Sequence, residues 1–188
     1  MRAPVSRMFC VAVFAAALSA CAPGANLPPM PPYANATYKL GPGDQIRIIT
    51  FGSEELTGPF NLDDTGNVAM PLIGNVPAAG LSTDAFAARL KQKMLDGGFL
   101  RNPSVAVQVA VYRPISVLGE VLKPGQYPFQ PGMTMLTAVA AAGGFTYRAV
   151  EDYAADIRNV DGQAVEGKIF ANSFLAPGDV VKIYERHF

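Results

Sequence analysis

The chain has 188 residues, and its 15 lysines and arginines balance 15 aspartates and glutamates, so its formal net charge is zero. A neutral chain has no long-range attraction for nucleic acid or anionic lipid, and we expect no nucleic-acid partner. The sequence has one histidine, His187, which excludes a multi-histidine metal site. Its two cysteines are Cys10 and Cys21.

The first 20 residues are typical of a secretory signal peptide. Arg2 and Arg7 precede an apolar run over 8–18, and Leu18-Ser19-Ala20-Cys21 closes the segment. The apolar run has eleven residues, fewer than the ~18–20 that a membrane-spanning helix needs. A lipoprotein signal peptidase requires small residues before a cysteine. We therefore expect cleavage before Cys21 and lipid attachment to its thiol.

Cleavage there would leave 168 residues with 13 basic and 15 acidic side chains. Cys10 would be lost and Cys21 acylated, so no disulfide could form within one mature chain. Three acyl chains hold a protein on a membrane far more firmly than one. Alanine rather than aspartate follows the cysteine, which is similar to an outer-membrane sorting signal. We expect a protein anchored by lipid on the periplasmic side of the outer membrane.

Residues 21–37 contain five prolines and no charged side chain. Proline removes a backbone donor and interrupts both helices and ladders. The composition therefore predicts a proline-rich tether between the lipid and a fold that begins at Tyr38.

A first domain is expected over 38–112. Its helix, over 82–96, has Ser82 or Thr83 as N-cap and Gly97-Gly98 as its stop. The apolar residues at four-residue spacing that this helix should bury are Phe86, Leu90 and Met94. In a strand over 104–112, the residues expected on one face are Val105, Val107, Val109 and Val111. The other strands are predicted over 45–51, 67–70 and 73–76.

Arg113-Pro114 breaks this alternation, and we place a domain boundary there, so the second domain covers 113–188. A helix over 134–142 is expected to bury Met135, Leu136, Val139 and Ala140. The strands predicted around it are 115–118, 155–160, 163–169 and 180–184. Pro124 and Gly125 are expected at the centre of a turn.

One sequence pattern occurs in both domains. Leu40-Gly41-Pro42-Gly43-Asp44 and Leu175-Ala176-Pro177-Gly178-Asp179 each precede a strand. Proline sets φ, glycine accepts a positive φ, and aspartate hydrogen-bonds the backbone of its own turn. We interpret both as structural turns, with a ligand contact by Asp44 or Asp179 as the less favoured alternative.

The sequence carries no G-x-S-x-G, Walker or dinucleotide-binding motif. The adjacent acids Glu54-Glu55 and Asp63-Asp64 are poor candidates for a glycosidase pair, whose carboxyl groups lie ~5–9.5 Å apart across a cleft. We therefore expect a protein that is not an enzyme and that uses no cofactor and no metal. The charged residues predicted to form a solvated face of the second domain are Glu151, Asp152, Asp156 and Arg158.

The order of several blocks resembles the outer-membrane polysaccharide export (OPX) family. The blocks at 38–48, 64–74, 79–83 and 102–109 are similar to its polysaccharide-export domain. Those at 117–127, 141–144, 157–158 and 175–181 are similar to the soluble-ligand-binding β-grasp (SLBB) domain that follows it. The resemblance implies an α+β, β-rich fold: a small polysaccharide-export β domain with one packed helix, then one β-grasp domain.

The same resemblance implies a non-catalytic lipoprotein that assembles as a homo-oligomeric ring and conducts capsular polysaccharide or exopolysaccharide outward. Such rings dock on an inner-membrane polysaccharide co-polymerase, or chain-length regulator. Large members continue into a C-terminal amphipathic pore helix, whereas this chain ends at Phe188. We expect a short form without that helix and a separate outer-membrane protein that supplies the pore.

Two other functions stay open at this point. One is a non-conducting glycan-binding or scaffolding lipoprotein, and the less favoured one is a periplasmic polysaccharide hydrolase or lyase. For ligand or subunit contact we select Arg158, whose planar donor fork suits uronate or hydroxyl oxygens, and Tyr147, on the expected loop after Gly143-Gly144. Either residue could instead serve packing.

Overall fold

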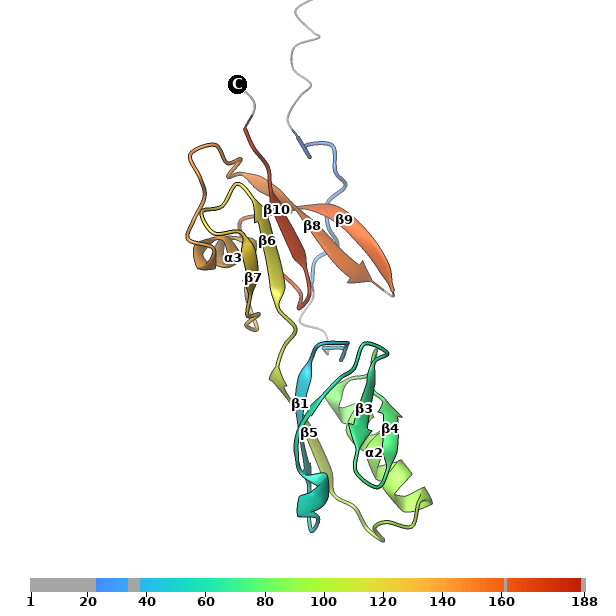
Figure 1. Ribbon diagram of the computed structural model, residues 1–188. Coiled ribbons are helices and arrows are strands. Elements are labelled where there is room, and N and C mark those ends of the chain that lie inside the picture. The colour runs from blue at the N-terminus through green and yellow to red at the C-terminus, as the bar shows by residue number, and fades with distance from the viewer. Residues whose placement is uncertain (1–22, 34–37, 161, 187–188) are drawn as a thin grey trace, which may run out of the picture.

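A computed structural model describes residues 23–33, 38–160 and 162–186. The elements form two bodies that lie end to end, joined by the segment between β5 and β6 (Figure 1). The buried apolar side chains accordingly fall into two clusters, one in each body. The α+β, strand-rich fold expected from the sequence is confirmed.

The N-terminal body contains a three-stranded antiparallel sheet in the order β2-β1-β5, a two-stranded β3-β4 hairpin and one helix. The element bounds are β1 Gln45–Thr50, the 3-10 turn η1 Glu54–Leu56, β2 Gly58–Asn61, β3 Asn67–Met70, β4 Gly74–Pro77, α2 Thr83–Asp96 and β5 Val105–Val111. The strand β2 was not expected from the sequence. It is short and carries a glycine and a proline, which weakens its strand signal.

The helix α2 forms as its sequence predicts. Ser82 is the N-cap, and its hydroxyl accepts a hydrogen bond from the Ala85 N–H at 3.1 Å. Phe86, Leu90 and Met94 are all fully buried against the N-terminal sheets. The four-residue spacing therefore identified the packed face correctly.

The strand β5 departs from strict alternation at its end. Val107 is buried and Val105 and Val109 are half-buried, but Val111 is 54% exposed. The pairing with β1 shifts here, since Ile46 faces Val109 while Gln45 faces Val111. A β-bulge at Ala110 changes the phase of the last residues, so the prediction of one common face for all four valines is wrong at Val111.

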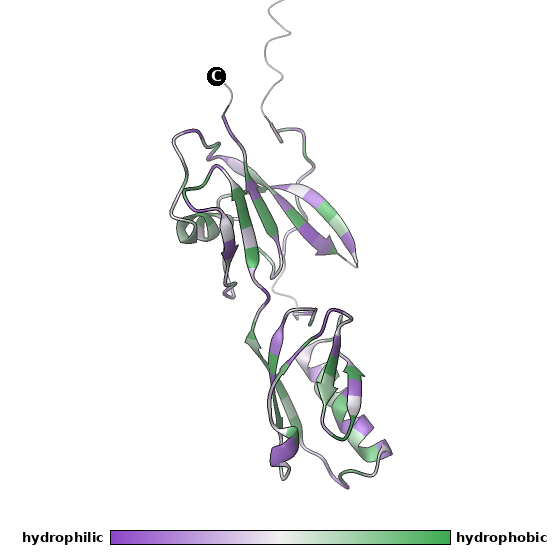
Figure 2. Cartoon of the chain, viewed as in Figure 1, coloured by the Kyte–Doolittle hydropathy of each residue, from purple (hydrophilic) through white to green (hydrophobic). Residues whose placement is uncertain are grey.

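The C-terminal body is a five-stranded mixed sheet in the order β7-β6-β10-β8-β9, with one helix packed on it. The central pair β6-β10 is parallel and the other pairs are antiparallel. The bounds are β6 Ile115–Gly119, β7 Gly125–Tyr127, α3 Met135–Ala141, β8 Tyr153–Val160, β9 Gln163–Phe170 and β10 Val180–Ile183. The central strands β6 and β10 carry mostly hydrophobic residues (Figure 2), as burial within a sheet requires.

Two local predictions for this body are corrected. In α3, Met135, Ala138 and Val139 are buried, whereas Leu136 is 51% exposed and Ala140 is also exposed. The inner face is therefore rotated by one residue from the predicted one. Gly125 is not in a turn, because it opens β7 and pairs with Val117. The connecting loop lies earlier, and the backbone N–H groups of its residues 122 and 123 bond the carbonyls of Gly144 and Ala142 at the end of α3.

Residues 23–33, which we call the N-terminal strap, pack along the C-terminal body. The Met30 N–H donates to the Lys168 carbonyl at 2.9 Å, and the Lys168 N–H donates to the Pro28 carbonyl at 2.7 Å. The Met30 side chain is 8% exposed and belongs to the core of this body. The predicted start of the fold at Tyr38 is therefore wrong, because the strap already packs on the C-terminal body and covers the outer edge of β9.

The strap predicts a specific sensitivity at Gly167. A Cβ built there would lie 2.8 Å from the Met30 Cα and 2.9 Å from its nitrogen, so alanine cannot coexist with the docked strap. We expect Gly167→Ala to release the strap and to cost about 1.5–3 kcal/mol of stability through exposure of Met30. Hydrogen exchange of the Met30 amide should lose its protection.

The matched control is Gly125→Ala, because Gly125 also lies in a strand but has no heavy atom within 4 Å of its added Cβ. Unchanged protection of the Met30 amide in Gly167→Ala would contradict the docking of the strap.

Candidate functional site

Asp44 is a buried carboxylate at the end of the N-terminal body. It is 1% exposed and accepts hydrogen bonds from the Tyr38 hydroxyl at 2.6 Å and from the Gly41 N–H at 2.9 Å. It also accepts from the backbone N–H of Arg113 at 3.0 Å. Burial and the hydrogen bond to Asp44 raise the pKa of the Tyr38 hydroxyl, so this hydroxyl keeps its proton and stays a donor.

The same turn recurs in the C-terminal body. The Asp179 N–H bonds the Ala176 carbonyl at 3.1 Å, as the Asp44 N–H bonds the Gly41 carbonyl at 3.1 Å. The Asp179 carboxylate accepts from the Ala176 N–H at 2.6 Å. The glycines before the two aspartates have φ of 88° and 87°, a conformation that favours glycine. Pro42-Gly43-Asp44 and Pro177-Gly178-Asp179 are thus equivalent turns.

Arg113 lies between these two turns. Its Nε–H donates to the Pro177 carbonyl at 2.9 Å, its Nη1 lies 3.7 Å from an Asp44 carboxylate oxygen, and its Cζ lies 5.7 Å from the centre of the Tyr38 ring. The rings of Tyr38, Tyr112 and Phe129 form a chain of edge-to-face contacts with centroid separations of 5.0 and 5.6 Å. Tyr38 packs on the N-terminal core, while Phe129 belongs to the C-terminal core. These contacts set how the two bodies meet.

Arg158 on β8 is buried with two carboxylates. Its Nε and Nη2 donate to Asp179 at 3.0 and 2.7 Å, and its Nη2 donates to Asp156 at 2.9 Å. Arg158 is 8% exposed, Asp179 is 1% exposed and Asp156 is fully buried. The predicted solvated face is therefore wrong at Asp156 and Arg158.

Asp156 is the unbalanced member of this cluster. Burial, together with the negative charge of Asp179, raises its pKa to about 8, against the lowering effect of Arg158. One of its oxygens, Oδ1, finds no hydrogen-bond partner among the described residues. Near neutral pH, Asp156 is therefore held largely in its neutral form, and the remaining ion pair of Arg158 with Asp179 carries no net charge.

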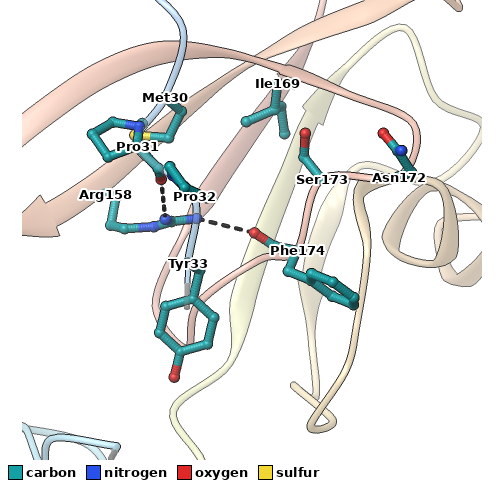
Figure 3. A pocket seen from close by; sticks show the side chains of 9 residues that line it. All are labelled: Met30, Pro31, Pro32, Tyr33, Arg158, Ile169, Asn172, Ser173 and Phe174. Carbon is teal, nitrogen blue, oxygen red and sulfur yellow. Dashed lines mark hydrogen bonds between the residues drawn. The ribbon is translucent and has the colours of Figure 1, made fainter. Parts of the chain in front are cut away.

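A pocket of about 260 Å³ opens beside Arg158, between the strap and the loop after β9 (Figure 3). Arg158 closes it by donating from Nη1 to the Pro31 carbonyl at 3.2 Å and from Nη2 to the Phe174 carbonyl at 3.3 Å. The Tyr33 ring centre lies 5.5 Å from the Arg158 Cζ. The lining residues are Met30, Pro31, Pro32, Tyr33, Arg158, Ile169, Asn172, Ser173 and Phe174.

The structure brings some of the selected residues together and separates others. Arg158 and Asp179 share one cluster, whereas Tyr147 is 87% exposed in a turn and does not line the pocket. Cys21 lies outside the described residues. Sequence reasoning placed Asp156 on a solvated face and missed its burial with Arg158, although Ala154, Asp156 and Arg158 alternate along a strand and so share one face. It also missed the strap residue Tyr33, for which the sequence holds no signal of docking.

Two further features are absent from the residues that the structure describes. None of the helices there is long and apolar enough to cross a membrane. Nor do any three histidine, cysteine, aspartate or glutamate side chains of these residues gather as a metal site would require.

Comparison with protein families defines the class of protein. Residues 32–110 match the family described as polysaccharide biosynthesis/export protein, and residues 114–162 match the SLBB domain. Together the two matches cover most of the chain in the order expected from the sequence. The chain therefore belongs to the outer-membrane polysaccharide export family.

Two characterised relatives carry this region within longer proteins. The exopolysaccharide production protein ExoF of Rhizobium meliloti (strain 1021) is 34% identical over 118 residues, which is 57% of this chain and 28% of ExoF. The polysialic acid transport protein KpsD of Escherichia coli is 30% identical over 112 residues, which is 58% of this chain and 20% of KpsD. The matched region thus spans less than a third of either relative.

The junction between the two bodies predicts the effect of Arg113→Ala. This change removes the Nε–H bond to Pro177 and the ion pair with Asp44, which together should cost about 1.5–3 kcal/mol. We expect small-angle scattering to show a wider range of angles between the bodies, with each core intact. Arg101→Ala, at an exposed loop position, is the control and should scatter like the wild type. Identical scattering by both variants would contradict this role of Arg113.

Asp156 predicts an unusual dependence of stability on pH. Its pKa is about 8 in the folded chain, above the usual value of 3.8. Between about pH 4 and pH 8 the folded state therefore binds the proton that the unfolded state releases. The contribution of Asp156 to stability is complete below pH 4 and declines by up to about 1.4 kcal/mol per pH unit as the pH rises.

Asp156→Asn cannot ionise, so it should flatten the decline in urea-unfolding free energy between pH 5 and pH 8. Asp152→Asn, at an exposed position, should leave that decline unchanged. Equal slopes for the two variants would show that Asp156 does not take up the proton.

Proposed function

We propose that this protein is a periplasmic lipoprotein of the outer membrane that forms part of the conduit for capsular polysaccharide or exopolysaccharide. The observation that carries the proposal is the order of the two domains, an export domain followed by an SLBB domain. The matched relatives named above are an exopolysaccharide production protein and a polysialic acid transport protein. We propose further that its role is non-catalytic.

The proposed lipid anchor gives the molecule an orientation. The strap begins at Pro23, whose carbonyl accepts a hydrogen bond from the Tyr153 hydroxyl at 3.0 Å. Two residues of chain span at most about 7 Å, so lipid on Cys21 would hold this end of the C-terminal body near the membrane. Because the two bodies lie end to end, the export domain would then point into the periplasm (Figure 1).

Exposed apolar side chains on both bodies support assembly into a homo-oligomeric ring. Phe51 is 84% exposed and Ile49 is 41% exposed in the N-terminal body. In the C-terminal body Leu118, Leu122 and Leu136 are 45, 63 and 51% exposed. Contacts between neighbouring copies would remove such side chains from water. The ring would receive polymer from an inner-membrane co-polymerase or chain-length regulator at its periplasmic end.

Partition of polysaccharide in a deletion strain tests this function. We expect polymer in the medium to fall at least tenfold in the deletion strain, with polymer retained in the envelope or its synthesis shut down. Restoration by the wild-type gene is the control, and Cys21→Ser should not restore secretion if the lipid anchor is required. Secretion that is unchanged in amount and chain length would contradict a conduit and favour a scaffolding role.

A further inference from the structure

The pocket between the strap and the loop after β9 has walls from two separate parts of the chain. Pro31 and Tyr33 belong to the strap, Asn172 and Phe174 belong to the loop, and Arg158 lies between them (Figure 3). Its volume of about 260 Å³ is just below the ~300–1,000 Å³ of sites for drug-sized ligands. A space of this size suits a single ring rather than a longer segment of a polymer.

The apolar part of the lining includes two accessible aromatic rings, those of Tyr33 and Phe174. The Phe174 side chain is 47% exposed and the Tyr33 ring is half-buried. A pyranose ring presents a face of C–H groups that stacks on an aromatic ring and leaves its hydroxyl groups free at the edge. Aromatic side chains with an accessible ring can therefore take up one face of a sugar.

Polar groups with free hydrogen-bonding capacity lie beside these rings. Asn172 is exposed, and its side-chain amide makes no hydrogen bond to the residues that the structure describes. The Ser173 Oγ accepts from the Phe170 N–H at 2.9 Å, which leaves its own hydrogen available. These groups can donate hydrogen bonds to the hydroxyl oxygens of a sugar and accept them from its hydroxyl hydrogens.

Arg158 offers one further donor. A guanidinium has five N–H groups. Nε–H and both hydrogens of Nη2 are used by Asp179, Asp156 and the Phe174 carbonyl, and one hydrogen of Nη1 is used by Pro31. One Nη1–H is left beside the pocket. Because two carboxylates already surround this guanidinium, the pocket has no excess positive charge that would select an anionic sugar.

We propose that this pocket binds one neutral pyranose unit of the exported polymer, stacked on Phe174 and hydrogen-bonded by Asn172, Ser173 and the free Nη1–H of Arg158. The proposal rests on the proposed export function, since it assigns a binding site for the exported polymer. The strap forms one wall, so the site exists only while the strap is docked. Repeated around a ring, sites of this kind would contact one polymer at several points.

Saturation-transfer difference NMR on the full-length protein in detergent tests the site with two probes, neutral cellohexaose and anionic hexagalacturonate. We expect signals from cellohexaose with the wild type, at least fivefold weaker signals with Phe174→Ala, and weaker transfer to hexagalacturonate. The matched control is Phe170→Ala, because Phe170 is 48% exposed, close to the 47% of Phe174, but does not line the pocket. Asn172→Ala provides a second variant, at an exposed loop position, in case Phe174→Ala does not fold.

The absence of saturation transfer to cellohexaose, an equal loss of signal in Phe170→Ala and Phe174→Ala, or a preference for hexagalacturonate would each overturn the proposal. The secretion assay distinguishes failure of the proposed sugar site from failure of the proposed export function. If the deletion strain stops secretion while Phe174→Ala binds cellohexaose like the wild type, the conduit stands and the site is wrong. If the deletion strain secretes normally, the export function itself is wrong.

Discussion

Asp44 and Asp179 are buried at the ends of two equivalent turns, and each carboxylate is balanced by an arginine and by backbone N–H groups. A buried carboxylate is costly unless such donors compensate it. The donors to Asp44 include Arg113, which joins the two bodies, and the donors to Asp179 include Arg158, which also bonds the strap. The need to compensate these two charges therefore determines how the main parts of the chain are placed.

The Arg158 cluster makes the strap part of the fold. The guanidinium bonds the Pro31 carbonyl, while Met30 occupies the core and pairs with the edge of β9. Without the strap, this edge would present unpaired backbone groups to other chains. In the proposed lipoprotein, the strap would also transmit the pull of the membrane anchor directly to the C-terminal sheet.

The proposed conduit function fits a molecule whose polar clusters are structural. Among the described residues, Asp156 has the carboxyl group with the most strongly shifted pKa, and it is buried and hydrogen-bonded by Arg158. The groups left free at the pocket are a single N–H, an amide and a hydroxyl beside an aromatic ring. Such groups are suited to weak contacts with sugars, which a polymer passing through a conduit must make and break.

The sequence by itself determined the local features. These include the helix capped by Ser82, its buried stripe, the two Pro-Gly-Asp turns and most strands, because caps, turns and periodicity depend on residues only a few positions apart. It also determined the family, through the order of these features. Only the tertiary structure decided that Arg158 is buried, that Val111 is exposed and that the strap docks. Arg158 bonds partners 21 and 127 positions away, and a bulge changed the phase at Val111. Contacts over such separations depend on how the strands assemble, and no local pattern encodes them.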